Sequence, residues 1–297
     1  MSESIFRKIK IIVNPNAGGG KGRKLFPVLQ QKLLERNLNF HLQFSESAEH
    51  ISLLAHQAQK EGYDLIVTCG GDGTAHQVLQ ALVGSPCALG IIPVGRGNDL
   101  NRNLGIAEDL DSSLDLLKTG KIRKIDVIQV NSDRYMFGVG GIGFDSEVNF
   151  ISNKLNNFLP GNMAYILPVL YKALTYRPKT VTVRTESEVY QGPILMVAFG
   201  NIKSYGKGMQ ITPLAEPDDG LLDVCWIDPV NTLRLYQLFP TVFSGKHIEQ
   251  PEVHYHQTIS AEVKSLVPMD FYGDGEFICQ TPFTLHVLHQ ALNVLVP

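Results

Sequence analysis

The chain has 297 residues, of which 44% are hydrophobic and 19% are charged, and this composition excludes an intrinsically disordered protein. Its formal charge of −3, from 26 basic and 29 acidic residues, argues against nucleic acid as a partner. The length suits one large domain or two domains of moderate size. Four cysteines lie far apart in apolar surroundings, which predicts reduced, buried thiols in a cytoplasmic protein: Cys69, Cys87, Cys225 and Cys279.

Two further segments bear on the expected location. The first residues lack the apolar core and small-residue cleavage site of a secretory signal peptide. The most apolar long stretch, residues 158–176, is interrupted by Pro160, Asn162, Pro168 and Lys172, so it fits a membrane-spanning helix poorly. We therefore expect no transmembrane span.

The first 130 residues alternate between strand and helix patterns. Strands are predicted at 8–14, 39–45, 64–70 and 88–94, and helices at 24–37, 48–62 and 74–83. Apolar strands separated by helices imply right-handed crossovers and a mostly parallel sheet. This half of the chain is predicted to form a Rossmann-like or flavodoxin-like domain.

Strand patterns dominate the second half of the chain. They occupy 134–141, 180–190, 192–201, 221–228 and 283–290, with helices expected only near 145–176 and 231–244. This succession of strand patterns with few helices predicts a second, β-rich sandwich domain. We place the domains at residues 1–128 and 129–288, with 289–297 as a candidate to return to the first domain.

Three glycine-rich loops follow predicted strands, at 14–23, at 70–74 ("GGDGT") and at 93–105. A glycine loop between a strand and a helix directs backbone N–H groups and the positive end of the helix dipole at one point, which suits a phosphate. Thr74 can cap the helix or donate to an oxyanion. Asp72 would repel phosphate unless it anchors the loop or faces a cation. A single loop of this kind could be a structural turn, but three at one sheet edge favour phosphate binding.

The ordered set of motifs resembles a known family. "GGDGT" followed by "IPVGRGND" at 92–99 resembles the catalytic domain of diacylglycerol kinases and of related sphingosine and bacterial lipid kinases. Residues 197–224 and "YGDGE" at 272–276 extend the resemblance over essentially the whole chain. The chain departs from the family at Arg96, where threonine is usual.

The resemblance implies ATP in the first domain, a lipid acceptor in the second, a catalytic cleft between them and magnesium as the cofactor. The ATP-binding positions that it implies are Asn14, Pro15, Asn16, Ala17, Gly18, Ser45, Gly70, Gly71, Asp72, Gly73, Thr74, Ala75, His76 and Arg96. Ser45 has an equally good alternative role as the N-cap of the following helix.

The resemblance also implies the acidic residues of the site. Glu276 would accept the proton of the acceptor hydroxyl, with Asp274 in the same site; an acidic surface hairpin is the alternative. Asp219 would hold a structural magnesium ion with Glu216 and the carbonyl of Leu221, unless these residues form a solvated turn. Asp99 and Asp126 would complete a network around the catalytic magnesium, although ordinary strand-end aspartates would look the same.

The predicted function is that of an ATP- and magnesium-dependent lipid kinase, with conversion of diacylglycerol to phosphatidic acid as the default reaction. Two alternatives remain: a kinase of a soluble substrate, as in NAD kinases, and a nucleotide-binding regulator without transfer activity. The expected partners are ATP, a lipid substrate and a membrane surface contacted transiently, and a homodimer is left open. The nine histidines show no zinc-binding spacing.

Overall fold

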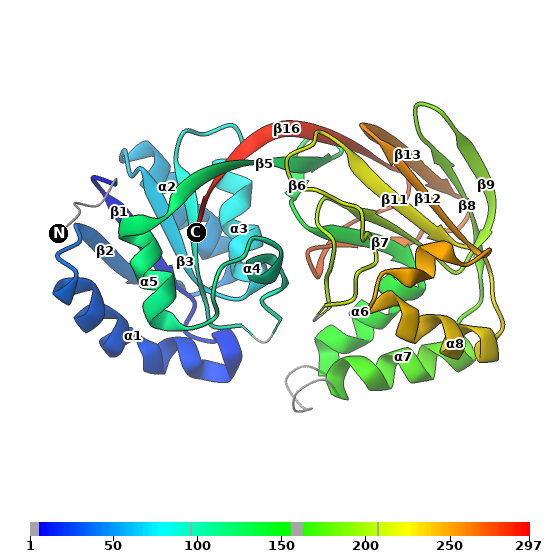
Figure 1. Ribbon diagram of the computed structural model, residues 1–297, viewed down its shortest axis with the longest axis horizontal. Helices are drawn as coiled ribbons and strands as arrows, with labels where there is room; N and C mark the ends of the chain where they lie inside the picture. Colours follow the sequence, from blue (N-terminus) through cyan, green and yellow to red (C-terminus); the bar gives the residue numbers. More distant parts are fainter. Residues whose placement is uncertain (1–5, 96, 156–162, 207) are drawn as a thin grey trace. The chain divides into compact units, whose positions relative to one another are not determined.

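The computed structural model describes residues 6–95, 97–155, 163–206 and 208–297. The chain forms two compact units, residues 1–127 with 289–297 (unit 1) and residues 128–288 (unit 2). Two strands, β5 (Lys121–Val130) and β16 (Phe283–Val296), each run from one unit into the other (Figure 1). The chain therefore crosses from one unit to the other within strands, at β5 and again at β16.

Unit 1 is built on a parallel sheet. Its strands are β1 (Ile9–Val13), β2 (Phe40–Phe44), β3 (Leu65–Gly70) and β4 (Ala88–Pro93), in the order β2-β1-β3-β4. The end of β16 adds a further parallel strand beside β4, with Asn293 opposite Ala88. Every residue of β1 and β3 is buried, as expected for strands covered by helices on both faces.

Helices cover both faces of this sheet. They are α1 (Ala17–Glu35), α2 (Ala48–Lys60), α3 (Asp72–Leu82), α4 (Asp99–Asn103) and α5 (Leu110–Thr119). One apolar cluster joins Leu29 and Leu33 of α1 with Leu114 and Leu117 of α5 over the central strands. On the other side, α2 packs on α3 and on β1.

Unit 2 contains two antiparallel sheets. The first has the order β12-β11-β10-β7-β14-β15 and the second includes β16, β13, β8 and β9. Their bounds are β6 (Arg134–Met136), β7 (Val139–Gly143), β8 (Lys179–Arg184), β9 (Val189–Ile194), β10 (Met196–Gly200), β11 (Leu222–Ile227), β12 (Val253–Thr258), β13 (Ser260–Ser265), β14 (Asp270–Gly273) and β15 (Glu276–Gln280). Side chains from both sheets share one core, which makes this unit a sandwich.

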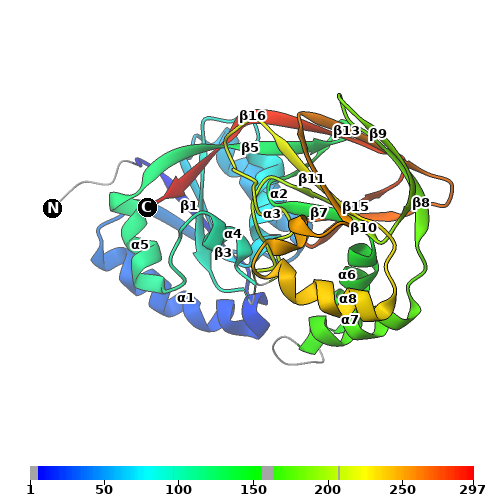
Figure 2. The same cartoon turned by 45° about the vertical axis from the view of Figure 1, so that its right-hand side comes forward.

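Helices α6 (Phe144–Leu155), α7 (Met163–Thr175) and α8 (Thr232–Val242) cover the outer face of the first sheet, followed by a short 3₁₀ turn, η1 (Lys246–Glu249). α7 packs on both α6 and α8 (Figure 2). The predicted fold class, a parallel α/β sheet followed by a β-sandwich, is confirmed.

An aromatic cluster holds the sandwich core together. The rings of Phe271 and Phe283, from opposite sheets, stack with centroids 4.4 Å apart, and Phe199 meets Phe271 edge to face at 6.1 Å.

We expect Phe271→Ala to lower the free energy of unfolding by about 3–5 kcal/mol, because it leaves a cavity in a fully buried site. Phe277→Ala is the matched control: this ring is 53% exposed, so the change should be about 0.5 kcal/mol or less. Urea denaturation measures both, and equal losses would contradict the assignment of the core.

Three details differ from the sequence-based expectations. Helix α5 was not predicted, although Leu110, Leu114 and Leu117 have helical spacing. The predicted strand at 283–290 continues through most of the segment 289–297 as the single strand β16, with Gln290 at φ 51°. Three thiols are free and buried as expected, but Cys279 is only half-buried.

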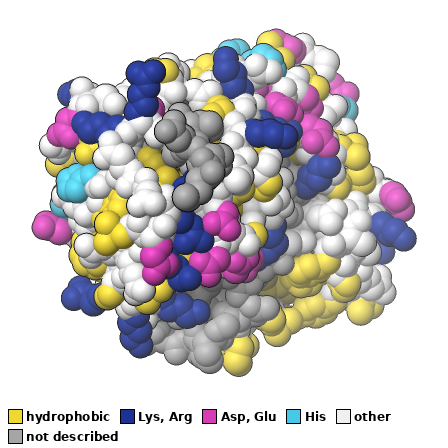
Figure 3. All heavy atoms as spheres, turned by 60° about the vertical axis from the view of Figure 1, so that its left-hand side comes forward, with side chains coloured by type: hydrophobic (Ala, Val, Ile, Leu, Met, Phe, Trp, Pro, Cys, Tyr) yellow, Lys and Arg dark blue, Asp and Glu magenta, His cyan; other side chains and the backbone are white. Residues whose placement is uncertain are grey.

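The surface carries both signs of charge. Lysine, arginine, aspartate and glutamate side chains are interspersed over the face drawn in Figure 3, in keeping with the net charge of −3. Among the described residues, no helix is both long enough and apolar enough to cross a membrane.

Candidate active site

The first glycine-rich segment forms a left-handed turn after β1. Gly18, Gly19 and Gly20 have φ values of 61°, 74° and 90°, which side chains with a Cβ rarely adopt. Asn14 organises this turn: its Oδ1 accepts the N–H of Asn16 at 3.0 Å, and its Nδ2 donates to Thr74 Oγ1 at 3.2 Å. Asn14 therefore ties the first glycine segment to the second. These three glycines interrupt the beginning of α1, so the regular part of the helix follows Gly20.

The second segment, "GGDGT", carries the chain from β3 into α3. Gly71 is the N-cap and Asp72 is the first helical residue, so the backbone N–H groups of the first turn point out of the helix end. Thr74 lies within that turn and accepts from Asn14, so the prediction that it caps the helix was wrong. Thr74, Ala75 and His76 are buried, which leaves the backbone around Gly71–Gly73 as the part that can face an anion.

Asp72 anchors the third segment. Its carboxylate accepts the backbone N–H groups of Asp99 and Leu100, both at 3.3 Å, at the start of α4. Of the two roles that the sequence left open for this carboxylate, the structure shows the anchoring one. Asp99 itself pairs with Arg102 at 2.6 Å. Arg96, between these residues and β4, lies outside the described residues.

Ser45 and Asp126 occupy other strand positions of unit 1. Ser45 follows β2, is buried, and places its hydroxyl 3.4 Å from the carbonyl oxygen of Val13. The N-cap of α2 is Ser47, whose side chain accepts the N–H of His50, so the alternative role of Ser45 as the cap was wrong. Asp126 on β5 is fully buried.

The Asp126 carboxylate has partners on β16. It accepts the N–H of Gln290 at 2.6 Å and lies 2.9 Å from Nδ1 of His289. These contacts join β5 to β16 at Gln290, where the backbone of β16 is left-handed. The structure thus gives Asp126 a structural role beside the one that the family resemblance implies.

The "YGDGE" segment is a tight turn between β14 and β15 in unit 2. Asp274, at φ 54°, accepts the N–H groups of Phe137 and Gly138 at 3.2 and 2.8 Å, and its own N–H donates to Val139. Asp274 therefore anchors the turn to the start of β7. The turn is also held by Asn153 of α6, which donates to the carbonyl of Gly275 at 3.1 Å.

Glu276 is the exposed residue that this anchored turn presents. It begins β15 opposite Gly273, and its negative charge, after burial and the charge of Asp270, helps to raise the pKa of the neighbouring Tyr272. An exposed carboxylate on a fixed turn is chemically able to accept a proton from a ligand.

The acidic turn before β11 places three carboxylates near one another. Asp219 accepts the N–H of Leu221 at 2.9 Å, and Glu216 pairs with Lys203 at 2.7 Å. Asp223 of β11 is fully buried, and Oδ1 accepts from Tyr255 at 2.6 Å, whereas Oδ2 has no hydrogen-bond partner within the described part of the chain. Burial, followed by the negative charges of Asp219 and Glu216, raises the pKa of Asp223 to about 6.

These oxygen atoms fit a hard cation in their chemistry, because a bound cation would offset the charge of the buried Asp223 carboxylate at Oδ2. Over the described ranges, however, no three acidic, histidine or cysteine side chains converge as a ready-made metal site. A magnesium ion here would therefore also need main-chain oxygens, of which the Leu221 carbonyl is one. Asp223 was not predicted, although it ends the acidic run "DDGLLD".

Two protein-family models match successive parts of the chain. Residues 8–130 match the model of the diacylglycerol kinase catalytic domain, and residues 138–296 match the YegS C-terminal NAD kinase beta sandwich-like domain. A protein of Mycobacterium tuberculosis named diacylglycerol kinase is 32% identical over 298 residues, covering 98% of this chain and 95% of the relative. The chain belongs to the diacylglycerol kinase family. A diacylglycerol kinase of Staphylococcus saprophyticus is 26% identical over 98% of this chain and 96% of its own.

The family fold is shared with solved structures. The crystal structure of a diacylglycerol kinase from Bacillus anthracis covers 99% of this chain and 98% of its own, with a TM-score of 0.78 at 20% identity. At that identity the likeness concerns the fold alone. It supports the same pairing of an α/β sheet with a β-sandwich that this member of the diacylglycerol kinase family has.

Proposed function

We propose that this protein is an ATP- and magnesium-dependent lipid kinase that transfers a phosphoryl group to a lipid hydroxyl, with diacylglycerol as the acceptor and phosphatidic acid as the product. Membership of the diacylglycerol kinase family and the names of the relatives support the substrate class. The observation that carries the proposal most directly is the fixed turn that presents Glu276 in unit 2, because a nucleotide-binding protein without transfer activity has no need of it.

The glycine segments of unit 1 support ATP as the donor. Asn14 links the left-handed turn at Gly18–Gly20 to the first turn of α3, so both sets of backbone N–H groups belong to one arrangement. Such groups at a helix N-terminus bind phosphate oxygens. Asp72 fixes the third segment to the same place, which supports phosphate contacts from the segment that carries Arg96.

The chemical step uses residues of unit 2 for the acceptor. The lipid hydroxyl oxygen forms a bond to the γ-phosphorus, the bond from that phosphorus to the β–γ bridging oxygen breaks, and ADP leaves. Glu276 takes the proton of the hydroxyl group. Asp274 acts through the turn, as a positioning residue that keeps Glu276 in place.

Magnesium would neutralise charge on the phosphate oxygens during transfer. Asp99 and Asp126 are the residues proposed for the acidic network around that ion. A second, structural ion is proposed at Asp219, Glu216 and the Leu221 carbonyl, and Asp223 joins them as a buried carboxylate whose Oδ2 has no partner among the described residues.

The structural ion gives a stability prediction. Asp219→Asn keeps an oxygen to accept the N–H of Leu221 but removes the charge that would bind the metal. Magnesium at a hundredfold excess over its Kd should raise the Tm of the wild type by about 5 °C, because the ion binds only the folded state. The shift should vanish in Asp219→Asn and in Asp223→Asn. Equal shifts in all three proteins, measured by differential scanning fluorimetry, would leave the segment an ordinary solvated turn.

A lipid substrate also requires contact with a membrane surface. Helix α7 exposes a row of large apolar side chains: Met163, Ile166, Leu167, Leu170, Tyr171 and Leu174. The basic residues Lys118, Lys121, Arg123 and Lys124 are the proposed contacts for anionic lipid, and Lys121 and Lys124 are exposed. We propose weak, reversible attachment through these two groups in a cytoplasmic protein.

Vesicle flotation tests this attachment. Leu170→Glu combined with Leu174→Glu should reduce the bound fraction about tenfold or more, because each change removes apolar contact and adds a charge. Leu53→Glu, at a site 63% exposed on α2, is the matched control and should bind as the wild type does. The bound fraction should rise with the content of anionic lipid. A bound fraction that changes neither with lipid charge nor with the α7 substitutions would contradict the proposed attachment.

The proposed reaction is tested by product identity. Purified protein is incubated with ATP, magnesium and a panel of diacylglycerol, phosphatidylglycerol, a sphingoid base and NAD⁺, and the products are resolved by mass spectrometry. Phosphatidic acid is the expected product. NADP⁺ would favour the soluble-substrate alternative, which the NAD kinase-like description of the second family model motivates. ATP binding with no phosphorylated product would favour the regulator.

A further inference from the structure

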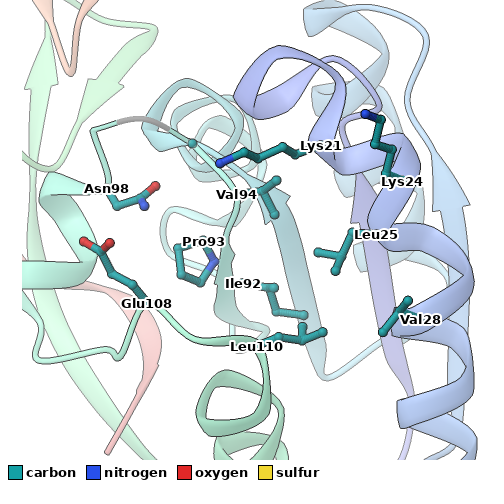
Figure 4. Close-up of a pocket in the computed structure, with 11 residues that line it drawn as sticks. Lys21, Lys24, Leu25, Val28, Ile92, Pro93, Val94, Asn98, Glu108 and Leu110 are labelled. Atoms are coloured by element: carbon teal, nitrogen blue, oxygen red, sulfur yellow. The ribbon is translucent and has the colours of Figure 1, made fainter. Parts of the chain in front are cut away.

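Unit 1 contains a pocket of about 460 Å³ beside the segments proposed for the phosphates of ATP. It lies between α1 and the segment that leads from β4 to α4 and α5 (Figure 4). Its lining residues are Lys21, Lys24, Leu25, Val28, Ile92, Pro93, Val94, Gly95, Asn98, Glu108 and Leu110. The volume is within the usual range for sites that bind small molecules.

Asn98 is a buried polar group of this pocket. It is only 7% exposed, and its buried Oδ1 atom has no hydrogen-bond partner among the residues that the structure describes. Its left-handed backbone, at φ 54°, is fixed as the N-cap of α4, which Asp72 anchors. Buried side-chain oxygens are normally paired, so this atom calls for a ligand that supplies an N–H or O–H donor.

The charges around the pocket favour an anionic ligand. Lys21 and Lys24 project from α1, and in Figure 4 the amine of Lys21 is directed across the pocket toward the side where Asn98 and Glu108 lie. The carboxylate of Glu108 lies 3.4 Å from Arg102 Nε, so its charge is already offset. Between these polar ends, Leu25, Val28, Ile92 and Leu110 form an apolar floor.

Among the described residues that line the pocket, none belongs to the GGDGT turn or to α3. A Cβ added at Gly18 would overlap the carbonyl oxygen of Val94, and one added at Gly71 would lie 3.2 Å from the Cα of Gly95. The backbone at Val94–Gly95 is therefore in close contact with both glycine segments. Val94 and Gly95 also line the pocket, which therefore adjoins the segments proposed for the phosphates of ATP.

We propose that this pocket is a second binding site, which takes a nucleoside monophosphate. A heterocyclic base has flat apolar faces for the floor and N–H donors for Asn98, and a phosphate group pairs with Lys21 and Lys24. A molecule of this size matches the pocket volume. The site does not depend on which lipid the enzyme phosphorylates, or on whether it phosphorylates one.

Calorimetry with AMP as the probe tests the second site. The protein is first saturated with AMP-PNP, a non-hydrolysable ATP analogue, so that the proposed donor site is filled. We expect one AMP to bind per chain, with adenosine and inorganic phosphate each binding at least tenfold more weakly. Complete loss of AMP binding in the presence of AMP-PNP would overturn the second site, and inorganic phosphate binding as tightly as AMP would overturn the nucleoside assignment.

Two substitutions on α1 form a matched pair. Val28→Trp fills the pocket, whereas Leu34→Trp adds the same ring at a position that is 60% exposed and outside the lining. Val28→Trp should weaken AMP binding at least tenfold and leave AMP-PNP binding unchanged; Leu34→Trp should alter neither. Lys24→Gln should weaken AMP but not adenosine.

The outcomes separate this inference from the proposed function. Unchanged AMP binding in both Val28→Trp and Lys24→Gln would place the nucleotide elsewhere and overturn the proposal. Failure of AMP-PNP to bind the wild type would instead contradict the ATP site, and AMP binding that is sensitive to Val28→Trp would still support this pocket.

Discussion

Glu276→Gln is expected to lower kcat by about 10²–10⁴, the usual contribution of a positioned general base. The substitution keeps the shape and hydrogen-bonding atoms of the side chain and removes only the basic carboxylate. The affinity for ATP should change little, because the residues proposed for the nucleotide belong to unit 1 while Glu276 belongs to unit 2. Steady-state kinetics with diacylglycerol in mixed micelles measures both quantities.

Two further variants separate the base from its support. Asp274→Asn retains one oxygen for the N–H groups of Phe137 and Gly138, so kcat should fall less than in Glu276→Gln. Glu186→Gln, the same change at an exposed turn of unit 2, should leave kcat unaltered. Near-normal kcat in Glu276→Gln would remove the β14–β15 turn from the active site.

Asp72→Ala is expected to lower kcat/KM for ATP by about 10–100-fold. The loss corresponds to about 1.5–3 kcal/mol, the usual contribution of hydrogen bonds to a charged group, because the N–H groups of Asp99 and Leu100 lose their acceptor. The segment that carries Arg96 would then no longer be held against the GGDGT turn. Thermal unfolding of the variant should show that unit 1 remains folded.

Asp72→Asn distinguishes the two roles of this side chain. An amide oxygen can still accept from α4, so a purely anchoring residue should retain most of its activity as asparagine. A residue that acts through magnesium should lose as much as in Asp72→Ala, with a shifted dependence of the rate on the metal. Asp115→Ala, an exposed carboxylate of the same unit, is the control and should behave as the wild type. Wild-type kinetics in Asp72→Ala would contradict both roles.

The fold could be predicted from the sequence because its signals are local. Continuous apolar runs such as "LIVTCG" identify strands covered on both faces, and alternating runs such as "TVTVR" identify the sandwich. Helix α5 was missed although Leu110, Leu114 and Leu117 have helical spacing and Asp109 caps its first turn; its packing on α1 and β4 adds to these local signals. The continuity of β16 could not be predicted, because no sequence signal reports that the strand runs on through the left-handed backbone of Gln290.

The site was predictable in its motifs and less so in its contacts. Glycine-rich segments mark positions where the backbone must approach a ligand, which is a property of single residues. The partners of Asp72, Asp274 and Asp223 lie 27, 136 and 32 or more residues away along the chain, and no local pattern reports such distances. The cap of α2 illustrates the same limit at short range, since Ser45 and Ser47 are chemically alike and only the backbone decides between them.

The most direct test of the central claim follows the phosphoryl group itself. The protein is given ATP labelled with ¹⁸O in the γ-phosphoryl group, in one mixture with magnesium, vesicles containing diacylglycerol, and NAD⁺. Mass spectrometry should find the label in phosphatidic acid with the wild type, and about 10²–10⁴-fold less of it with Glu276→Gln. Label that appears only in NADP⁺ or in inorganic phosphate, or an equal yield of labelled phosphatidic acid from both proteins, would contradict the account.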